Sequence, residues 1–253
     1  MDGEVFSIDR GAGLPASLCI HGFCQSSRFW EPVVDLIAGS GGRAVAPDLP
    51  GFGGSAGVAG PFTMEGYADW LASLIRSLDV GSVSVIGGSM GGVIAQHLVL
   101  RHPDVVARLV LVATGGNTPN PQAALDRANM LESTEWTPEL AQATAAGFFY
   151  RQLSPADLDS YSSIVLQADR AAAVSAARSN ALSATLERLV EVRVPTLIVQ
   201  GREDRGRTPS HGADMRDRIP GSRLVVLDGA GHTPQLERTE EFWDVVKPFL
   251  LAG

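Results

Sequence analysis

The sequence predicts an α/β protein with a mostly parallel central sheet, helices on both of its faces and a helical cap. Three observations predict this fold class. Short β-type runs recur along the 253 residues, most of them precede a longer helical pattern, and from Val83 onward the runs are almost continuously apolar. Strands buried on both faces show such continuous apolar runs, and alternating strands and helices are typical of a parallel sheet covered by helices.

Seven runs are candidate strands. The first two have the sequences EVFSID and ASLCI, and the third, RAVAPDL, follows a glycine-rich turn. The other four are SVSVIG, RLVLVA, PTLIVQG and RLVVLDG. In order, they cover residues 4–9, 16–20, 43–49, 82–87, 108–113, 195–201 and 223–229.

Five helical patterns alternate with these runs. The pattern from Thr63 to Leu78 spaces its apolar residues for one helix face. The helix after Ser89 should end at Arg101, because Pro103 follows shortly. The expected helices cover residues 26–38, 63–78, 90–101, 209–218 and 236–251.

One stretch, residues 115–190, contains no convincing strand. It is rich in Ala, Ser, Leu and Gln and predicts four or five helices. Its segments TPEL and SPAD are good helix starts, since each has a hydroxyl residue, then proline, then an acidic residue in the first turn. We therefore expect residues 115–190 to form a cap, or lid, over the ends of the sheet, and residues 1–114 and 191–253 to form the core.

The composition argues against several kinds of partner and cofactor. The formal net charge is −8 and no block of like charges occurs, so we expect neither nucleic acid nor a membrane as a partner. The single lysine, Lys247, lies in a helical pattern near the C-terminus, a poor position for a Schiff base or pyridoxal phosphate. Cys19 and Cys24 form neither a disulfide framework nor a zinc motif. We expect no cofactor and no metal.

The first residues, MDGEVFSIDRGAG, are acidic and mixed, unlike a signal peptide, and the longest apolar stretches are far shorter than a membrane span. These features predict a soluble, cytoplasmic protein, either a monomer or a homodimer.

A glycine-rich turn around Ser89 is the first candidate site. Gly87-Gly88-Ser89-Met90-Gly91 fits the pattern G-x-S-x-G between a strand and a helix, which is the context of a nucleophile elbow. There the serine takes a strained conformation at the apex, and glycines let the strand and helix pack closely. The alternative is a turn of this kind without chemistry.

A serine hydroxyl needs a base to remove its proton, and the sequence offers five histidines. His232 differs from the others because it lies on a loop with two glycines, just after the last strand and before the last helix. His97 and His102 lie in or at the end of a helix, and His211 begins what looks like a surface helix. We therefore choose His232 as the base.

The imidazole needs an acid to fix its tautomer. Glu203 and Asp204 lie just past the penultimate strand, and parallel strands share their carboxyl ends, so both would lie near Ser89 and His232. We favour Asp204, with Glu203 and Asp228 as rivals. The alternative for Asp204 is an ion pair with a neighbouring arginine.

Two backbone amides could stabilise an oxyanion. The run LCIHGFCQSSRFW follows an early strand, and its His-Gly pair can turn the next amide, that of Phe23, toward the serine. With the amide of Met90 this would form a two-donor oxyanion hole, worth roughly 3 kcal/mol per donor to an acyl-transfer transition state. The alternative is a plain turn at the strand end.

Together these pieces resemble the α/β-hydrolase fold superfamily, in its cap-bearing, mostly bacterial group of serine hydrolases and esterases. The resemblance rests on HGF, PDLPGFGGS, GGSMGG, GREDRGRTP and GAGHTPQLE, in that order over nearly the whole chain. It implies the α/β-hydrolase fold, a catalytic triad of Ser89, Asp204 and His232, and a cap formed by residues 115–190.

The chain departs from the group's pattern in three places. Gly88 stands where many relatives carry histidine, which would leave room behind the serine. The first strand-end loop lacks a long glycine run, and Thr233-Pro234 follows the histidine where carbon–carbon bond hydrolases tend to have an aromatic. The last two features count against that subgroup.

The cap holds aromatic residues at helical spacing that could line an apolar pocket or pack a core: Trp136, Phe148, Phe149, Tyr150 and Tyr161. If they line the pocket, the substrate is a small, uncharged or weakly charged molecule. Arg151 and Arg170 could bind a carboxylate, but exposure to solvent is the better explanation for them.

These observations predict a serine hydrolase that cleaves an ester or lactone of a small, largely apolar substrate through an acyl-enzyme. One alternative keeps the fold and uses His232 as a base for elimination, cyclisation or cofactor-free oxygenation. The other is a non-catalytic protein that binds a small ligand.

Overall fold

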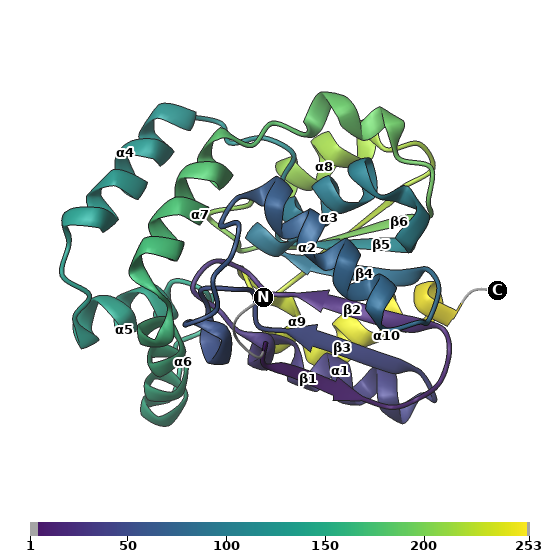
Figure 1. Cartoon of the computed structure of the whole chain (residues 1–253), viewed down its shortest axis with the longest axis horizontal. Coiled ribbons are helices and arrows are strands. Elements are labelled where there is room, and N and C mark those ends of the chain that lie inside the picture. Colours follow the sequence, from purple (N-terminus) through teal and green to yellow (C-terminus); the bar gives the residue numbers. More distant parts are fainter. Residues whose placement is uncertain (1–4, 252–253) are drawn as a thin grey trace.

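Seven strands form one sheet in the computed structural model, which describes residues 5–251 (Figure 1). Each of the seven predicted runs overlaps one strand; Glu4, the first residue of the first run, lies outside the described residues. The strands are β1 (Ser7–Arg10), β2 (Ala16–Ile20), β3 (Arg43–Pro47), β4 (Val83–Gly88), β5 (Val106–Val112), β6 (Thr196–Gly201) and β7 (Arg223–Leu227).

The order across the sheet is β1-β3-β2-β4-β5-β6-β7. β1 pairs antiparallel with β3, and every other neighbouring pair is parallel. The predicted α/β class with a mostly parallel sheet is therefore confirmed. Because the parallel strands share their carboxyl ends, the loops that leave β2, β4, β6 and β7 meet at one edge of the sheet.

Helices cover both faces of the sheet. α1 (Glu31–Gly39) and α10 (Thr239–Leu251) pack on one face, and α2 (Met64–Ser77), α3 (Met90–Arg101) and α8 (Pro209–Arg218) pack on the other.

Successive residues of β4 show how the two layers of core form. Val85 lies fully buried among the side chains of α2 and α3, and the next residue, Ile86, lies fully buried among those of α1 and α10. Side chains of a strand alternate between its two faces, so a strand covered on both sides needs apolar residues at every position. This accounts for the continuous apolar runs in the sequence.

The prediction of one continuous helix over residues 236–251 is wrong, because the helix is interrupted. The structure has a single turn, α9 (Pro234–Glu237), and then α10, with Arg238 between them outside the helical region at φ −136° and ψ 55°. The expected helix over 26–38 begins with a 3-10 turn, Ser27–Trp30, before α1.

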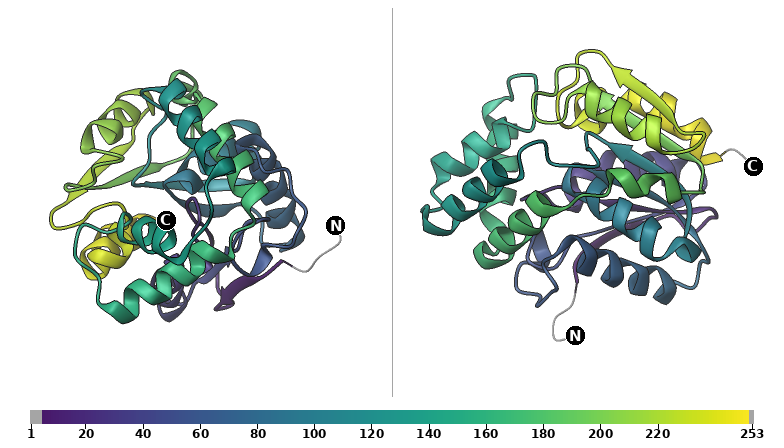
Figure 2. Two further views of the ribbon diagram at one scale, coloured as in Figure 1. Left: turned by 90° about the vertical axis from the view of Figure 1, so that its left-hand side faces the viewer. Right: turned by 90° about the horizontal axis from the view of Figure 1, so that it is seen from above.

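Between β5 and β6 the chain forms α4 (Pro121–Ser133), α5 (Pro138–Ala146), α6 (Pro155–Gln167) and α7 (Arg170–Leu182). These four helices lie together at one end of the sheet (Figures 1 and 2). The predicted starts at TPEL and SPAD are confirmed, because the hydroxyls of Thr137 and Ser154 accept hydrogen bonds from amides in the first turns of α5 and α6.

These helices are attached to the sheet by both apolar and polar contacts. Phe29, next to β2 in the fold, packs against Tyr161 of α6 with the ring centroids 5.0 Å apart, and the ring centroids of Tyr161 and Phe149 are 4.8 Å apart. The amide of Asp169 donates to the carbonyl of Gly51 at 2.8 Å. Buried residues of α5, α6 and α7 belong to the same hydrophobic core as the sheet.

No helix between residues 5 and 251 combines the length and the apolar character needed to cross a bilayer.

Candidate active site

Ser89 lies at the sharp turn between β4 and α3, with φ 52° and ψ −116°. This is a strained conformation for a residue with a side chain. The turn is held by the Ser89 amide, which donates to the carbonyl of Val112 at 2.9 Å, and by the Thr114 hydroxyl, which donates to the carbonyl of Ser89 at 2.8 Å. The predicted strand–turn–helix context of Ser89 is thus present.

The glycines of the motif are required by close backbone packing. A Cβ atom on Gly87 would lie 2.4 Å from the carbonyl oxygen of Gly91, and one on Gly91 would lie 2.2 Å from that of Ile20. Neither distance is compatible with a side chain, so α3 packs directly against the backbone of β2 and β4.

The room expected behind the serine, where Gly88 replaces a larger residue, is filled. A Cβ atom on Gly88 would lie 3.1 Å from the indole of Trp30, which is almost fully buried. The absence of a side chain at position 88 is compensated by this ring, so the expectation of extra space is wrong.

His232 and Asp204 lie within hydrogen-bonding distance of each other and of the serine. The Nε2 atom of His232 is 2.8 Å from the Oγ atom of Ser89, and its Nδ1 atom is 2.6 Å from the Oδ2 atom of Asp204. The Asp204 side chain is 1% exposed and the His232 side chain 18%, so the carboxylate is withdrawn from solvent while the ring faces the cleft. A carboxylate accepts the Nδ1 hydrogen of a neutral ring, which leaves Nε2 free to accept the serine proton.

Asp204 is distinguished from its rivals by what each carboxylate contacts. The second oxygen of Asp204 accepts the amides of Gly206 and Arg207, both at 2.8 Å. Glu203 accepts the amide of Ala230 at 3.1 Å, and Asp228 forms a surface ion pair with Arg202. The proposed ion pair of Asp204 with a neighbouring arginine side chain does not occur within residues 5–251.

The other histidines have partners of their own. The Nε2 atom of His97 lies 2.8 Å from the Ser183 hydroxyl, His102 contacts Asp69, and His211 contacts the Thr208 hydroxyl. His21 is fully buried beside the loop that follows β2, where its Nε2 atom accepts the amide of Leu49 at 2.9 Å.

The amides of Phe23 and Met90 are both available beside Ser89. Met90 is the first residue of α3, so its amide hydrogen has no acceptor within the helix. Within residues 5–251 the Phe23 amide has no hydrogen-bond acceptor either. Gly22 approaches the serine closely, since a Cβ atom on it would lie 3.2 Å from the Cβ of Ser89.

Sequence reasoning missed the residues that hold the Phe23 loop in place. The Gly22 amide donates to the Gln25 side chain at 2.9 Å, and the buried Asp48 carboxylate accepts the amides of Ser27 and Gly54 at 2.6 and 2.7 Å. Burial lowers the pKa of His21, with the Asp48 charge acting in the opposite direction. The run PDLPGFGGS was the signal in the sequence, because no other role is apparent for its aspartate, Asp48.

Glu237 was also missed, although it ends the quoted run GAGHTPQLE. One of its carboxylate oxygens accepts the amide of Gly231 at 2.8 Å, next to His232, and the other accepts the amide of Tyr150 at 2.6 Å. A single carboxylate therefore connects the His232 loop to the segment between α5 and α6.

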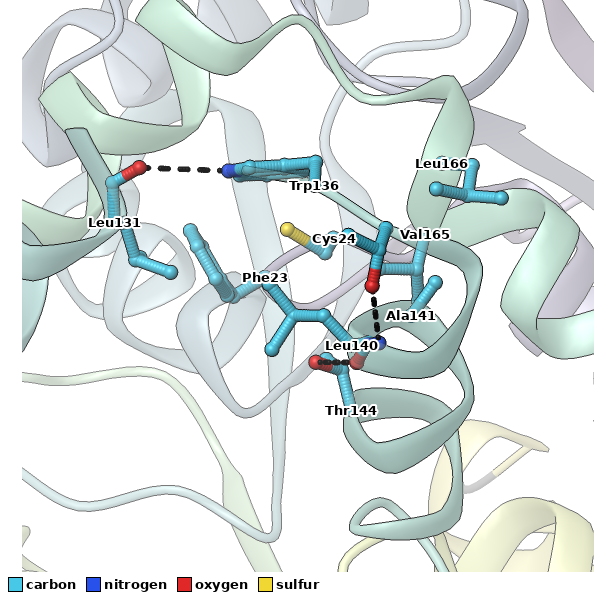
Figure 3. Close-up of a pocket in the computed structure, with 10 residues that line it drawn as sticks. Phe23, Cys24, Leu131, Trp136, Leu140, Ala141, Thr144, Val165 and Leu166 are labelled. Atoms are coloured by element: carbon cyan, nitrogen blue, oxygen red, sulfur yellow. Dashed lines mark hydrogen bonds between the residues drawn. The ribbon is translucent and has the colours of Figure 1, made fainter. Parts of the chain in front are cut away.

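Three hollows surround the site. The first, which we call the Cys24 pocket, is a small space of about 30 Å³ lined by Phe23, Cys24, Trp136, Leu140 and Val165. Figure 3 shows these side chains converging around the Cys24 sulfur, with the Trp136 indole hydrogen-bonded to the carbonyl of Leu131. Such a volume holds about one water molecule or one methyl group.

The second hollow, the histidine cleft, has about 840 Å³ and is lined by His232, Asp204, Phe149, Tyr150 and Arg127 among others. The third, the arginine cleft, has about 600 Å³ and is lined by Phe23, Leu131, Leu140, Arg127 and Arg207 among others. Of the five cap aromatics, Trp136 lines the Cys24 pocket and Phe148, Phe149 and Tyr150 line the histidine cleft.

Within residues 5–251 no group of three or more His, Cys, Asp and Glu side chains is arranged to hold a metal ion.

The sequence model of the alpha/beta hydrolase fold matches residues 15–239, and the chain belongs to this family. Its relatives include proteins named as an esterase and as a hydrolase. The chain is 32% identical over 246 residues to the pimeloyl-[acyl-carrier protein] methyl ester esterase of Neisseria meningitidis serogroup A, covering 91% of this chain and 75% of that protein. It is 29% identical over 261 residues to the 2-hydroxymuconate semialdehyde hydrolase of Pseudomonas putida, covering 96% and 89%.

A solved structure also supports the α/β-hydrolase fold. The enol-lactonase from Burkholderia xenovorans LB400 superposes with a TM-score of 0.89 at 25% identity, covering 97% of this chain and 96% of that one. The α/β-hydrolase fold is therefore established, and the chain is a hydrolytic or related enzyme of this family.

Proposed function

We propose that the protein is a serine hydrolase that cleaves an ester or a lactone, with Ser89 as nucleophile, His232 as base and Asp204 as the orienting acid. The observation that carries this proposal is the pair of contacts His232–Ser89 at 2.8 Å and His232–Asp204 at 2.6 Å. A hydroxyl, an imidazole and a buried carboxylate in this order can transfer a proton away from the serine as it attacks.

In the first half of the reaction, Ser89 Oγ attacks the substrate carbonyl carbon while its proton passes to His232 Nε2. The carbonyl oxygen becomes negative and accepts hydrogen bonds from the amides of Phe23 and Met90, each worth roughly 3 kcal/mol in the transition state. Asp204 stabilises the imidazolium. The C–O bond then breaks, and His232 Nε2 returns the proton to the leaving oxygen.

In the second half, a water molecule attacks the acyl-enzyme. His232 accepts one of its protons and then donates it to Ser89 Oγ as the acyl bond breaks, releasing the acid. From a lactone, the acid and the alcohol leave as one molecule. The strained turn supports this role, because it projects the hydroxyl beyond the sheet edge and next to the helix N-terminus, which favours negative charge.

We assign residues 115–190 to a cap over this site and residues 1–114 and 191–253 to the core. In support, Phe148, Phe149 and Tyr150 share the histidine cleft with His232. A cap of this kind restricts access to small molecules, and the names of the esterase and enol-lactonase relatives agree with an ester or lactone as substrate.

A panel of p-nitrophenyl esters of increasing chain length, together with several lactones, tests the proposal. We expect hydrolysis by the wild type and a loss of about 10³-fold or more in kcat/KM for Ser89→Ala. The exposed Ser82, which directly precedes β4, provides the control, since Ser82→Ala should leave the rate unchanged.

A fluorophosphonate probe gives an independent readout of the nucleophile. It should label the wild type and Ser82→Ala but not Ser89→Ala. Turnover that survives Ser89→Ala and is lost in His232→Ala would contradict the acyl-enzyme mechanism and favour base chemistry by His232.

A further inference from the structure

Two arginines line the arginine cleft without an acidic partner. Arg207 is partly buried, and its guanidinium donates to the carbonyl of Asn117 at 3.0 Å. Within residues 5–251 no carboxylate lies within ion-pair distance of Arg207, and Arg127 of α4 has neither a hydrogen bond nor an ion pair. Both side chains therefore have free N–H donors.

Arginines elsewhere on the molecule commonly pair with carboxylates. Arg101 contacts Asp69 at 2.7 Å and Arg178 contacts Glu132 at 2.6 Å. Since acidic residues outnumber basic ones by 28 to 20, an arginine in an acidic protein has many possible partners. Arg127 and Arg207 have no such ion pair, and they are the two arginines that line this cleft.

The carboxylate whose charge acts on Arg207, that of Asp204, already has hydrogen-bond partners. Asp204 raises the pKa of Arg207, but burial has the larger effect and lowers it. Both oxygens of Asp204 are engaged, one by His232 and the other by two backbone amides. A guanidinium stays protonated at neutral pH even so, and a partly buried charge without a counter-charge is costly.

The rest of the cleft wall is mostly apolar and includes no Asp or Glu. Ala128, Leu131, Leu140 and Ala181 contribute much of it. Phe23, whose amide we propose as an oxyanion donor, lines the same cleft, and Arg127 also lines the histidine cleft. The arginine cleft therefore adjoins the reacting centre and offers both an apolar wall and two positive groups.

We infer that the arginine cleft binds the anionic end of an amphiphilic substrate, with Arg127 and Arg207 contacting a carboxylate or a phosphate group. This rests on the proposed function, and it narrows the substrate to an ester or lactone that also carries such an anion. Both anions fit the planar guanidinium, which can donate two parallel hydrogen bonds. The apolar wall contacts the chain between the anion and the scissile bond.

Arg127 and Arg207 are not the two arginines, Arg151 and Arg170, that were considered from the sequence as carboxylate ligands. Arg170 contacts the carbonyl of Glu132 on the outside of α4 and α7, and Arg151 lines none of the three hollows around the site. The substrate therefore carries a charge at one end, whereas the aromatic residues of the cap alone predicted an uncharged or weakly charged molecule.

Binding without turnover tests the site independently of the chemistry. Octanoate, octyl phosphate and 1-octanol share one alkyl chain and differ in the head group, and their affinities can be measured by calorimetry. We expect the wild type to bind at least one anion about tenfold more tightly than the alcohol, and Arg127→Gln and Arg207→Gln each to weaken anion binding by about tenfold. The preferred anion distinguishes a carboxylate from a phosphate.

Arg216→Gln is the matched control. Arg216 lies on the exposed side of α8 and contacts its neighbour Asp217, so its replacement should leave all three affinities unchanged. Arg127 is exposed and unpaired, so its variant should fold even if Arg207→Gln does not. Equal binding of the alcohol and both anions, or anion binding unaffected by Arg127→Gln, would overturn the inference.

Turnover separates this inference from the proposed function. Monomethyl suberate and dimethyl suberate differ in one charge, and we expect the wild type to prefer the charged ester about tenfold in kcat/KM at low salt, less so at high salt. Equal rates on both esters would contradict the anion site and leave the serine hydrolase intact. Selective anion binding without any hydrolysis or probe labelling would contradict the hydrolase and leave the anion site.

Discussion

Asp204 and Asp228 follow neighbouring strands of the sheet, yet only Asp204 faces His232. Its carboxylate is withdrawn from solvent and accepts two backbone amides besides the imidazole. Asp228 points outward to Arg202, and its side chain is 78% exposed. Two residues of one type at the same sheet edge thus have different environments, which permits a direct comparison.

Asp204→Asn should lower kcat for the best ester by about 10⁴-fold, because an amide in place of the carboxylate favours the wrong imidazole tautomer. Asp228→Asn should leave kcat within about twofold of the wild type, since a surface ion pair contributes little. Steady-state kinetics on the same ester measures both. Comparable losses in the two variants would contradict the assignment of Asp204.

At the residue scale, the sequence singled out Ser89, His232 and Asp204 as candidates, because each lies in a motif after a recognisable strand, and the structure places their side chains within hydrogen-bonding distance. It left Glu203 and Asp228 open because it specifies the loop but not the direction of each side chain. Arg207 and Glu237 were missed for a related reason: their importance comes from which backbone groups and hollows they meet, and those partners lie far away along the chain.

At the element scale, the strand–turn–helix unit around Ser89 depends on a glycine at position 91. Gly91→Ala should lower the free energy of unfolding by about 2 kcal/mol or more, because its Cβ would lie 2.2 Å from the carbonyl oxygen of Ile20 and the backbone must shift. Gly39→Ala is the control, since no atom lies within 4 Å of its Cβ; it should stay within about 1 kcal/mol of the wild type.

Urea unfolding followed by circular dichroism measures both stabilities. A Gly91→Ala variant as stable as Gly39→Ala would show that α3 can move away from β2 without cost.

The connection between the His232 loop and the cap depends on Glu237. Glu237→Ala removes the acceptor of the Gly231 and Tyr150 amides, so we expect these two amides to exchange their hydrogens about tenfold faster. Hydrogen exchange followed by mass spectrometry or NMR measures the effect. Glu240→Ala, an exposed carboxylate in the first turn of α10, is the control and should leave both amides protected.

The elements themselves were largely predictable, and the reasons are local. Buried strands are short apolar runs, and α5 and α6 begin at a hydroxyl residue followed by proline. The break at Arg238 was not predictable from periodicity, because α9 and α10 continue the same apolar pattern on either side of it. How α4 to α7 pack on one another was equally hidden, since Ala-rich helices carry few side chains that specify a partner.

At the scale of the whole molecule, two buried histidines make stability depend on pH. Burial lowers the pKa values of His21 and His97 below the usual 6.5, although Asp48 and Glu65 respectively oppose this effect. The unfolded chain then binds more protons than the folded one, so stability is unaffected above about pH 6.5 and falls as pH decreases below it.

We expect the free energy of unfolding, measured by urea titration, to decrease between pH 7 and pH 5, and to decrease less in His97→Gln, which keeps a donor for the Ser183 hydroxyl. Carboxylates act in a lower window: hydrogen bonding to Arg101 lowers the pKa of Asp69 to about 2, so its contribution is lost only below about pH 4. A stability that stays constant from pH 7 to pH 5 would contradict the prediction.

The chain leaves the sheet after β5 and returns to it before β6 at nearly the same place. Asn117 and Ala184 form an isolated antiparallel bridge, and the carbonyl of Gly116 accepts the amides of Thr185 and Leu186 at 2.8 and 3.1 Å. The two ends of the segment that carries α4 to α7 are therefore held together by backbone contacts that lie outside these helices. The segment between Asn117 and Ala184 can therefore change in length or sequence during evolution while Ser89 and His232 keep their positions. New substrate specificities can arise in this way without a change in the catalytic residues.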